Sequence, residues 1–74
     1  MNLSNAFLTM RNLHKTDSRT MAKKTNGEYS IRSIQNFMAK GANPTLKNIQ
    51  LCCELIGCKV SDLMIEAERY EQGE

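Results

Sequence analysis

Several features that mark enzymes are missing from this sequence. It has one histidine, His14, and no sequence partner places that imidazole in a pattern typical of a catalytic triad. No glycine-rich phosphate loop is present. Most of the carboxylates crowd into the C-terminal third, where they form a solvated acidic face. We therefore expect no enzymatic activity and no small-molecule ligand.

Long hydrophobic runs and targeting signals are missing as well. No apolar run approaches the ~20 residues that a helix needs to cross a bilayer. The N-terminus lacks the pattern of a signal peptide. We expect a soluble cytoplasmic protein that does not contact a membrane.

The cysteines do not form the spacing of a zinc site. Cys52, Cys53 and Cys58 lie within seven residues of one another, and His14 is far away in the sequence. Cys52 and Cys53 are adjacent, so on a helix they point about 100° apart and do not suit a disulfide. We expect buried free thiols that act as small hydrophobic side chains, with no metal and no other cofactor.

What is present is one small domain with an uneven charge. The chain has 74 residues and a net charge of +2, and we expect a domain over 1–70 followed by a frayed tail at 71–74. Residues 1–50 carry eight Lys and Arg against two Asp and Glu, whereas residues 51–74 carry two against six. A basic N-terminal part and an acidic C-terminal part can orient one face of the protein toward a polyanion. Chance clustering in a short chain is the alternative.

Helical spacing of apolar residues predicts five short helices and no strand. The helices are expected at about 2–14, 17–25, 30–40, 45–56 and 61–70. Candidate N-caps are Asn2 or Ser4, Thr16 or Asp17, Ser30, and Ser61 or Asp62. Asn26-Gly27 predicts a turn, and Gly41 and Gly57 suit the residue that follows a helix. The apolar side chains expected to face inward are Leu3, Ala6, Phe7, Met10, Leu13, Met21, Ala22, Ile34, Phe37, Met38, Leu46, Ile49, Cys52, Cys53, Ile56, Leu63, Met64 and Ala67.

The expected helix 30–40 has an outer face suited to DNA. Its apolar residues Ile34, Phe37 and Met38 share one side. The remaining side carries forked or adaptable donors and acceptors and no carboxylate, namely Arg32, Ser33, Gln35, Asn36 and Lys40. Such side chains suit base edges and phosphates. An ordinary solvated helix face is the alternative.

From Pro44 onward the sequence resembles the phage Cro/cI-type repressors, the lambda-repressor-like or XRE family of helix-turn-helix domains. The family has apolar or small residues where this chain has Leu46, Ile49, Cys52, Cys53, Ile56, Cys58, Val60 and Leu63, and a glycine at Gly57. Upstream, Ile34, Met21-Ala22 and Arg11 also match, so that the resemblance covers about residues 3–68. Three positions depart from the pattern: Ser18 replaces a glutamine, Thr25 a leucine and Lys40 a glycine. The interval from Met21 to Ile34 is about two residues longer than usual, so the turn between the second and third helices is enlarged.

The resemblance implies a compact all-α fold of five helices, with a helix-turn-helix at the second and third. By position, the residues that read DNA bases would be Ile31, Arg32, Ser33, Gln35 and Asn36. The residues that contact phosphates would be Ser18, Arg19, Ser30, Lys40, Asn43 and Lys47. Ile31 could instead pack under the enlarged turn, and each charge could be plain solvated surface. In the family, Arg11 more often forms an internal ion pair than a DNA contact.

Two functions remain open from the sequence. The first is a sequence-specific transcriptional regulator that binds a double-stranded DNA operator as a homodimer, with a dimer interface formed by Leu63, Met64, Ala67 and Tyr70 of the last helix. The alternative role for that helix is to cap the monomer core. The second function is a protein-interaction module, antitoxin-like or regulator-binding, with weak or no DNA binding.

Overall fold

The computed structural model describes residues 2–71, and over that range the chain is built from helices and contains no strand. The helices are α1 (Leu3–Leu13), α2 (Ser18–Lys24), α3 (Ile31–Met38), α4 (Leu46–Ile56) and α5 (Val60–Glu71). The prediction of a small all-α domain with five helices is therefore confirmed. Of the predicted tail, Glu71 is the last residue of α5, and residues 72–74 lie outside the described range.

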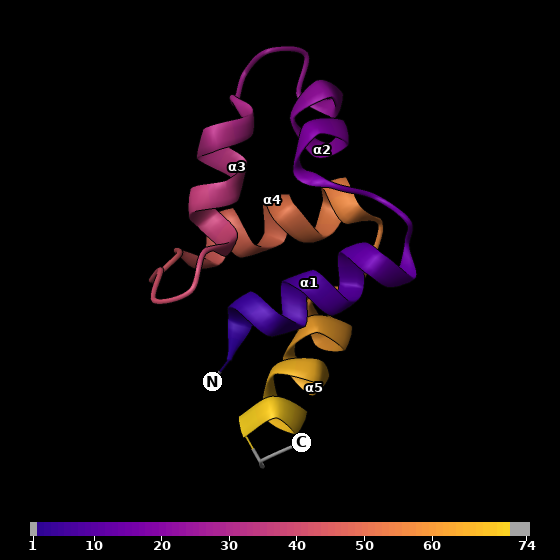
Figure 1. Ribbon diagram of the computed structural model, residues 1–74, viewed down its shortest axis with the longest axis vertical. Coiled ribbons are helices and arrows are strands. Elements are labelled where there is room, and N and C mark those ends of the chain that lie inside the picture. The colour runs from indigo at the N-terminus through magenta and orange to yellow at the C-terminus, as the bar shows by residue number, and fades with distance from the viewer. Residues whose placement is uncertain (1, 72–74) are drawn as a thin grey trace.

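The helices form two ends joined by α4. Helices α2 and α3 lie side by side at one end, connected by a long turn, and α1 packs against α5 at the other (Figure 1). Helix α4 lies across the molecule and contacts α2, α3 and α5. The domain is elongated, with extents of 37 × 22 × 16 Å. The two ends can thus present different surfaces to different partners.

The core takes one large side chain from almost every helix. Phe7 of α1, Met21 of α2, Ile34 of α3 and Leu63 of α5 are completely buried. Burying each such side chain stabilises the fold by about 1.5–3 kcal/mol. Cys52 and Cys53 of α4 are buried with them as free thiols, as predicted, whereas Cys58 is a free thiol that is only half-buried.

Two leucines predicted to face inward are exposed instead. Leu13 is 66% exposed and Leu46 is 61% exposed. Leu13 is the last residue of α1 and Leu46 the first residue of α4, so both lie past the part of the helix that the core covers. Helical spacing alone could not show where the covering neighbours end.

Side-chain caps fix the starts of the first four helices. Asn2, Asp17, Ser30 and Thr45 each accept a hydrogen bond from the backbone N–H three residues later. The prediction of Ser30 as an N-cap is confirmed. Neither Ser61 nor Asp62 caps α5, because that helix begins one residue before Ser61. Asp62 instead lies in its first turn, where the helix dipole favours an acid.

The end of α3 also differs from the prediction. The helix ends at Met38, and Ala39 is already extended, with φ −69° and ψ 153°. Gly41 therefore does not follow a helix directly. It adopts φ 81° in a turn that is closed by a 3.0 Å hydrogen bond from the Ala42 N–H to the Ala39 carbonyl. This turn needs a glycine at its third position.

Candidate nucleic-acid interface

The turn between α2 and α3 is held in one shape by Thr25. Its hydroxyl donates to the Ala22 carbonyl at 2.6 Å and accepts from the Tyr29 N–H at 3.1 Å. Asn26 and Gly27 both have positive φ, and the Glu28 N–H closes the turn on the Thr25 carbonyl at 3.2 Å. The Tyr29 ring packs edge-on against Phe37 with centroids 5.7 Å apart. The extra length of this turn is thus ordered and fixes where α3 begins.

Four of the five predicted base-reading residues share one exposed face of α3. Ile31, Arg32, Gln35 and Asn36 are exposed, whereas Ile34 and Met38 are buried against the core. Positions i, i+1, i+4 and i+5 of a helix form one continuous stripe. Together they offer a guanidinium fork, two carboxamides and an aliphatic surface, with no carboxylate among them.

Ser33, the fifth predicted base-reading residue, is placed differently. It is half-buried, and its hydroxyl accepts a 3.1 Å hydrogen bond from the Ser30 hydroxyl. Its backbone N–H donates to the same Ser30 oxygen. Ser30 and Ser33 therefore satisfy each other at the start of α3, so that Ser33 is less available to a ligand than its neighbours on the stripe.

A depression between α2 and α3 brings cations next to the stripe. It has a volume of about 480 Å³, and its lining includes Arg19, Lys23, Ser30 and Ile31. Arg19 and Ser30 were both predicted as phosphate contacts, and the fold places them around one hollow. Lys23, which lies late on α2 and was not among the predicted contacts, joins them.

Ser18 does not contact phosphates from an exposed position as predicted. Its side chain is buried, and its hydroxyl accepts a 3.1 Å hydrogen bond from Nη1 of Arg11. The first turn of α2 faces α1 at this position, which turns the serine inward. Arg11 accordingly has an internal role, with a hydroxyl in place of the carboxylate partner that the resemblance implies.

Asp17 puts a negative charge beside Arg19. Its exposed carboxylate caps α2, and the hydrogen bond from the Thr20 backbone N–H lowers its pKa below the ordinary value of 3.8. The carboxylate is therefore ionised at neutral pH. This carboxylate occupies the N-terminal end of α2, where the helix dipole would otherwise attract an anion. Phosphate binding at this end therefore depends on the charges of Arg19 and Lys23 alone.

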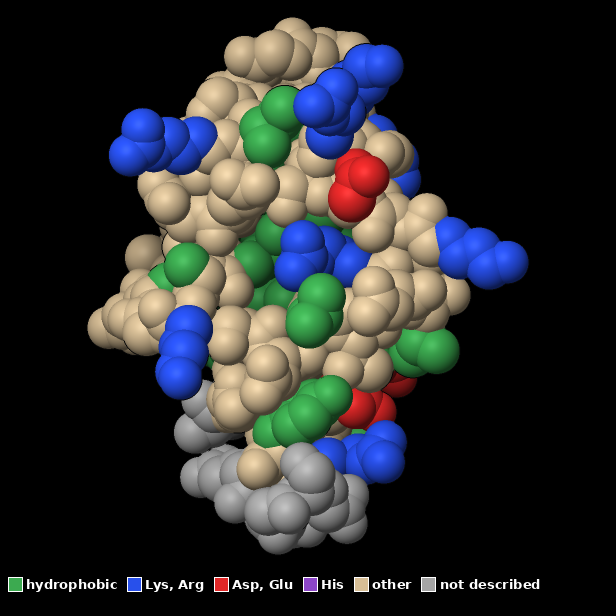
Figure 2. Space-filling model, in the orientation of Figure 1, with side chains coloured by type: hydrophobic (Ala, Val, Ile, Leu, Met, Phe, Trp, Pro, Cys, Tyr) green, Lys and Arg blue, Asp and Glu red, His purple; other side chains and the backbone are tan. Residues whose placement is uncertain are grey.

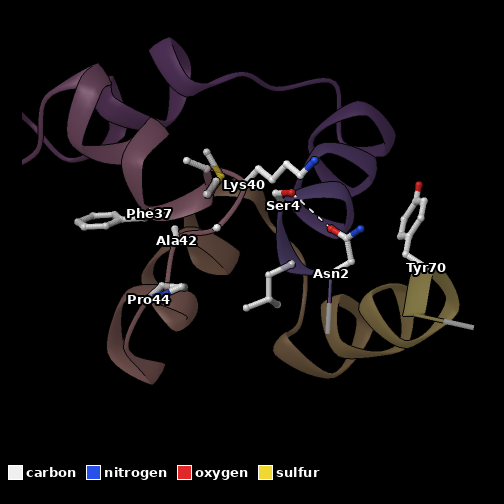
Figure 3. Close-up of a pocket in the computed structure, with 11 residues that line it drawn as sticks. Asn2, Ser4, Phe37, Lys40, Ala42, Pro44 and Tyr70 are labelled. Atoms are coloured by element: carbon white, nitrogen blue, oxygen red, sulfur yellow. Dashed lines mark hydrogen bonds between the residues drawn. The ribbon is translucent and has the colours of Figure 1, made fainter.

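Lys40 lies beside the start of α1. It lines a depression of about 390 Å³ together with Asn2, Ser4, Pro44 and Tyr70, and its side chain extends toward Ser4 (Figure 3). Asn43 and Lys47, the other predicted phosphate contacts of this region, are exposed around the start of α4.

Lys24 of α2 has a structural role. Its Nζ donates to the Leu55 carbonyl at 2.9 Å and so holds α2 to the end of α4.

Basic side chains stand on both sides of the α2–α3 pair on the face drawn in Figure 2, with apolar side chains between them. The same view shows acidic colour close to these basic side chains as well. The charge asymmetry of the sequence is thus carried into a surface in which cations surround the start of α3.

The predicted dimer interface needs a correction. Leu63 and Ala67 are 0% exposed and belong to the core of a single chain, because α5 packs them against α1. Met64 and Tyr70 are half-buried, and the hydroxyls of Tyr70 and Thr9 share a 2.7 Å hydrogen bond. Leu13 of α1 and Ile65 of α5, which is 58% exposed, are among the exposed apolar residues at this end. They line a depression of about 250 Å³ together with Met10, His14, Asp62 and Glu66.

Residues 2–71 contain no group of three or more His, Cys, Asp or Glu side chains placed to hold a metal ion. Within the same range, no helix has the length and apolar character to cross a bilayer.

Comparisons with protein-family models, with curated proteins and with solved structures found no match to this chain. Its function is therefore inferred from its own residues and their arrangement.

Proposed function

We propose that this protein is a sequence-specific DNA-binding transcriptional regulator that reads the major groove with α3. The observation that carries the proposal is the stripe of Ile31, Arg32, Gln35 and Asn36, which is exposed, free of carboxylates and bordered by Arg19 and Lys23.

Each side chain on the stripe has a defined match on a base edge. Arginine forks onto O6 and N7 of guanine, and asparagine or glutamine pairs with N6 and N7 of adenine. Ile31 can pack on the methyl group of thymine. The exposed Arg19, Lys40 and Lys47 would contact phosphates and set the register of α3 in the groove.

A second copy of the chain is part of this proposal. One α3 helix reaches only a few base pairs, so a symmetric dimer on a palindrome with half-sites about one helical turn apart supplies the remaining contacts. The acidic α5 end, with Asp62, Glu66 and Glu68, would lie away from the DNA, where its charge is not repelled by phosphates.

The test is footprinting on the DNA upstream of the gene that encodes this chain, at two salt concentrations. A protected palindrome is expected, with an affinity that falls steeply as salt rises because phosphate contacts release counterions. Arg32→Ala and Asn36→Ala should each weaken that site by about 5- to 150-fold, the value of one bidentate base contact at ~1–3 kcal/mol. Lys59→Ala is the matched control, because it removes the same charge from an exposed residue of the α4–α5 connection.

Weak and uniform coating of the DNA, equal in wild type and both α3 variants, would contradict the proposal. So would an equal loss of affinity in the Lys59→Ala control, since a contact that reads bases must depend on its position.

One observation favours a second candidate, a protein-interaction module. Leu13 and Ile65 are exposed around a depression that α1 and α5 form together. An apolar surface of this kind binds protein partners with little dependence on salt, whereas DNA binding through ~5–8 phosphates weakens strongly. The salt series of the footprinting experiment therefore separates the two functions.

A further inference from the structure

The end of α4 brings two cysteines together. Gly57, with φ 96°, ends the helix, and its N–H donates to the Cys53 carbonyl at 2.8 Å. The Cys58 N–H donates to the same carbonyl at 3.0 Å. The chain therefore folds back over Cys53 immediately after the helix, and Cys58 is the residue placed there.

The bond from the Cys58 N–H to the Cys53 carbonyl is the one that characterises the Schellman motif. In that motif the side chains of the two bonded residues, here Cys53 and Cys58, usually contact each other. Apolar side chains usually make that contact. Here both are thiols, and each of them contributes to the pKa of the other. Cys52 is one residue earlier and so points about 100° away around the helix. It lies close enough to Arg11 for the positive charge to act on the pKa of its thiol.

The two cysteines of the pair differ in their exposure to solvent. Cys53 is completely buried, whereas Cys58 is half-buried. Cys58 is therefore the more accessible residue of the pair. A buried thiol next to an accessible one has the arrangement of a resolving cysteine beside an attacking one.

We propose that Cys53 and Cys58 form a modification site, a dithiol that hydroperoxides convert into an intramolecular disulfide. This inference uses none of the residues of the proposed DNA face and does not depend on that function.

The reaction with hydrogen peroxide balances in two steps. The Cys58 thiolate attacks one peroxide oxygen, the O–O bond breaks, and a sulfenic acid and one water form. The sulfur of Cys53 then attacks the sulfenic sulfur, an S–S bond forms, and hydroxide leaves and takes up the Cys53 proton as a second water. Two thiols are oxidised, and one peroxide is reduced to two waters.

Burial sets the rate of this reaction. It raises the pKa of the Cys58 thiol, and it raises the pKa of Cys53 to about 12, with the Cys58 thiol adding to the shift. Little thiolate is present at neutral pH, and thiolate is the reactive form. We therefore expect slow oxidation at pH 7 and a rate that rises steadily toward pH 9.

The experiment treats the folded full-length chain with hydrogen peroxide, then denatures it and blocks the remaining thiols with iodoacetamide. Cleavage after Glu54 separates Cys52 and Cys53 from Cys58. We expect the two fragments to remain joined until a reductant is added, with the alkyl group on Cys52. Fragmentation of the linked peptides between Cys52 and Cys53 assigns the bond in the wild-type chain, so the result does not depend on whether a variant folds.

Variants provide matched controls for the assignment. Cys52→Ala should form the crosslink at the wild-type rate, and Cys58→Ala should form none. The melting temperature of the oxidised chain should be several degrees above that of the reduced chain, because the bond closes the α4–α5 corner. A link to Cys52, a link between two chains, or oxidation that stops at sulfinic acid on Cys58 would each overturn the proposal.

Discussion

Arg11 holds the start of α2 against α1 from inside the protein. Its Nη1 donates to the buried Ser18 hydroxyl at 3.1 Å, whereas its Nε is buried and has no hydrogen-bond partner among residues 2–71. Its charge also acts to lower the pKa of Cys52, against the larger effect of burial, which raises it to about 11. A guanidinium in this position orders the α1–α2 corner and leaves Arg19 as the exposed cation of the first turn of α2.

The buried thiols predict a loss of stability at high pH. An unfolded thiol titrates near 9, whereas burial raises the pKa of Cys52 to about 11 and that of Cys53 to about 12. Between these values the unfolded chain releases protons that the folded chain keeps, so stability is complete below pH 9 and falls as pH rises through this range. Melting temperatures measured from pH 8 to pH 11 should fall more steeply for the wild type than for Cys53→Ala.

All other titratable side chains are the same in both proteins. Parallel curves for the wild type and Cys53→Ala would therefore show that the buried thiol is not responsible.

At the scale of elements, the end of α1 carries backbone strain that the sequence did not reveal. Lys15 has φ 53°, in the left-handed region, although it is not a glycine. The Thr16 N–H donates to the Arg11 carbonyl at 2.9 Å, and the Lys15 N–H to the Asn12 carbonyl at 3.2 Å. These two bonds are those of the Schellman motif, which usually has a glycine at the position of Lys15. Here they hold a lysine in that conformation.

Lys15→Gly should therefore stabilise the domain by about 0.5–1 kcal/mol, because glycine adopts this φ without steric cost. The measurement is the free energy of unfolding from urea denaturation. Lys15→Ala is the control, because it removes the same exposed side chain and keeps the Cβ that causes the strain. Equal stabilities for the two variants would show that the side chain, and not the backbone conformation, determines the effect.

At the scale of the whole molecule, the dimer that we propose would use the exposed apolar surface at the α1–α5 end. Leu13 and Ile65 line this surface, with His14 on the α1 side and Asp62 on the α5 side. This surface would take the place of the interface predicted around Leu63 and Ala67, which are buried in the core of a single chain.

Leu13→Glu should consequently shift the sedimentation coefficient from that of a dimer to that of a monomer at micromolar concentrations, since it places a charge in an apolar interface. Leu46→Glu is matched to it, because Leu46 is a similarly exposed leucine at a helix end away from this surface. A dimer that survives Leu13→Glu, or one that Leu46→Glu disrupts equally, would contradict this location.

The sequence by itself determined the helices and most of the core. Helical spacing of apolar residues and capping residues such as Ser30 involve only residues four or five positions apart. They can therefore be recognised in the sequence before the fold is known. The same local chemistry placed Arg32, Gln35 and Asn36 on one polar face and gave Gly57 its role after α4.

Only the tertiary structure decided which of those residues face a neighbour and which face solvent. Ser18 is turned inward by α1, Leu63 and Ala67 are covered by the same helix, and Leu13 and Leu46 extend past the core. The meeting of Cys53 with Cys58 depends on how the chain reverses at Gly57. Burial depends on where distant helices end and how they pack, and a periodic pattern along one helix carries no information about the length of the helix that covers it.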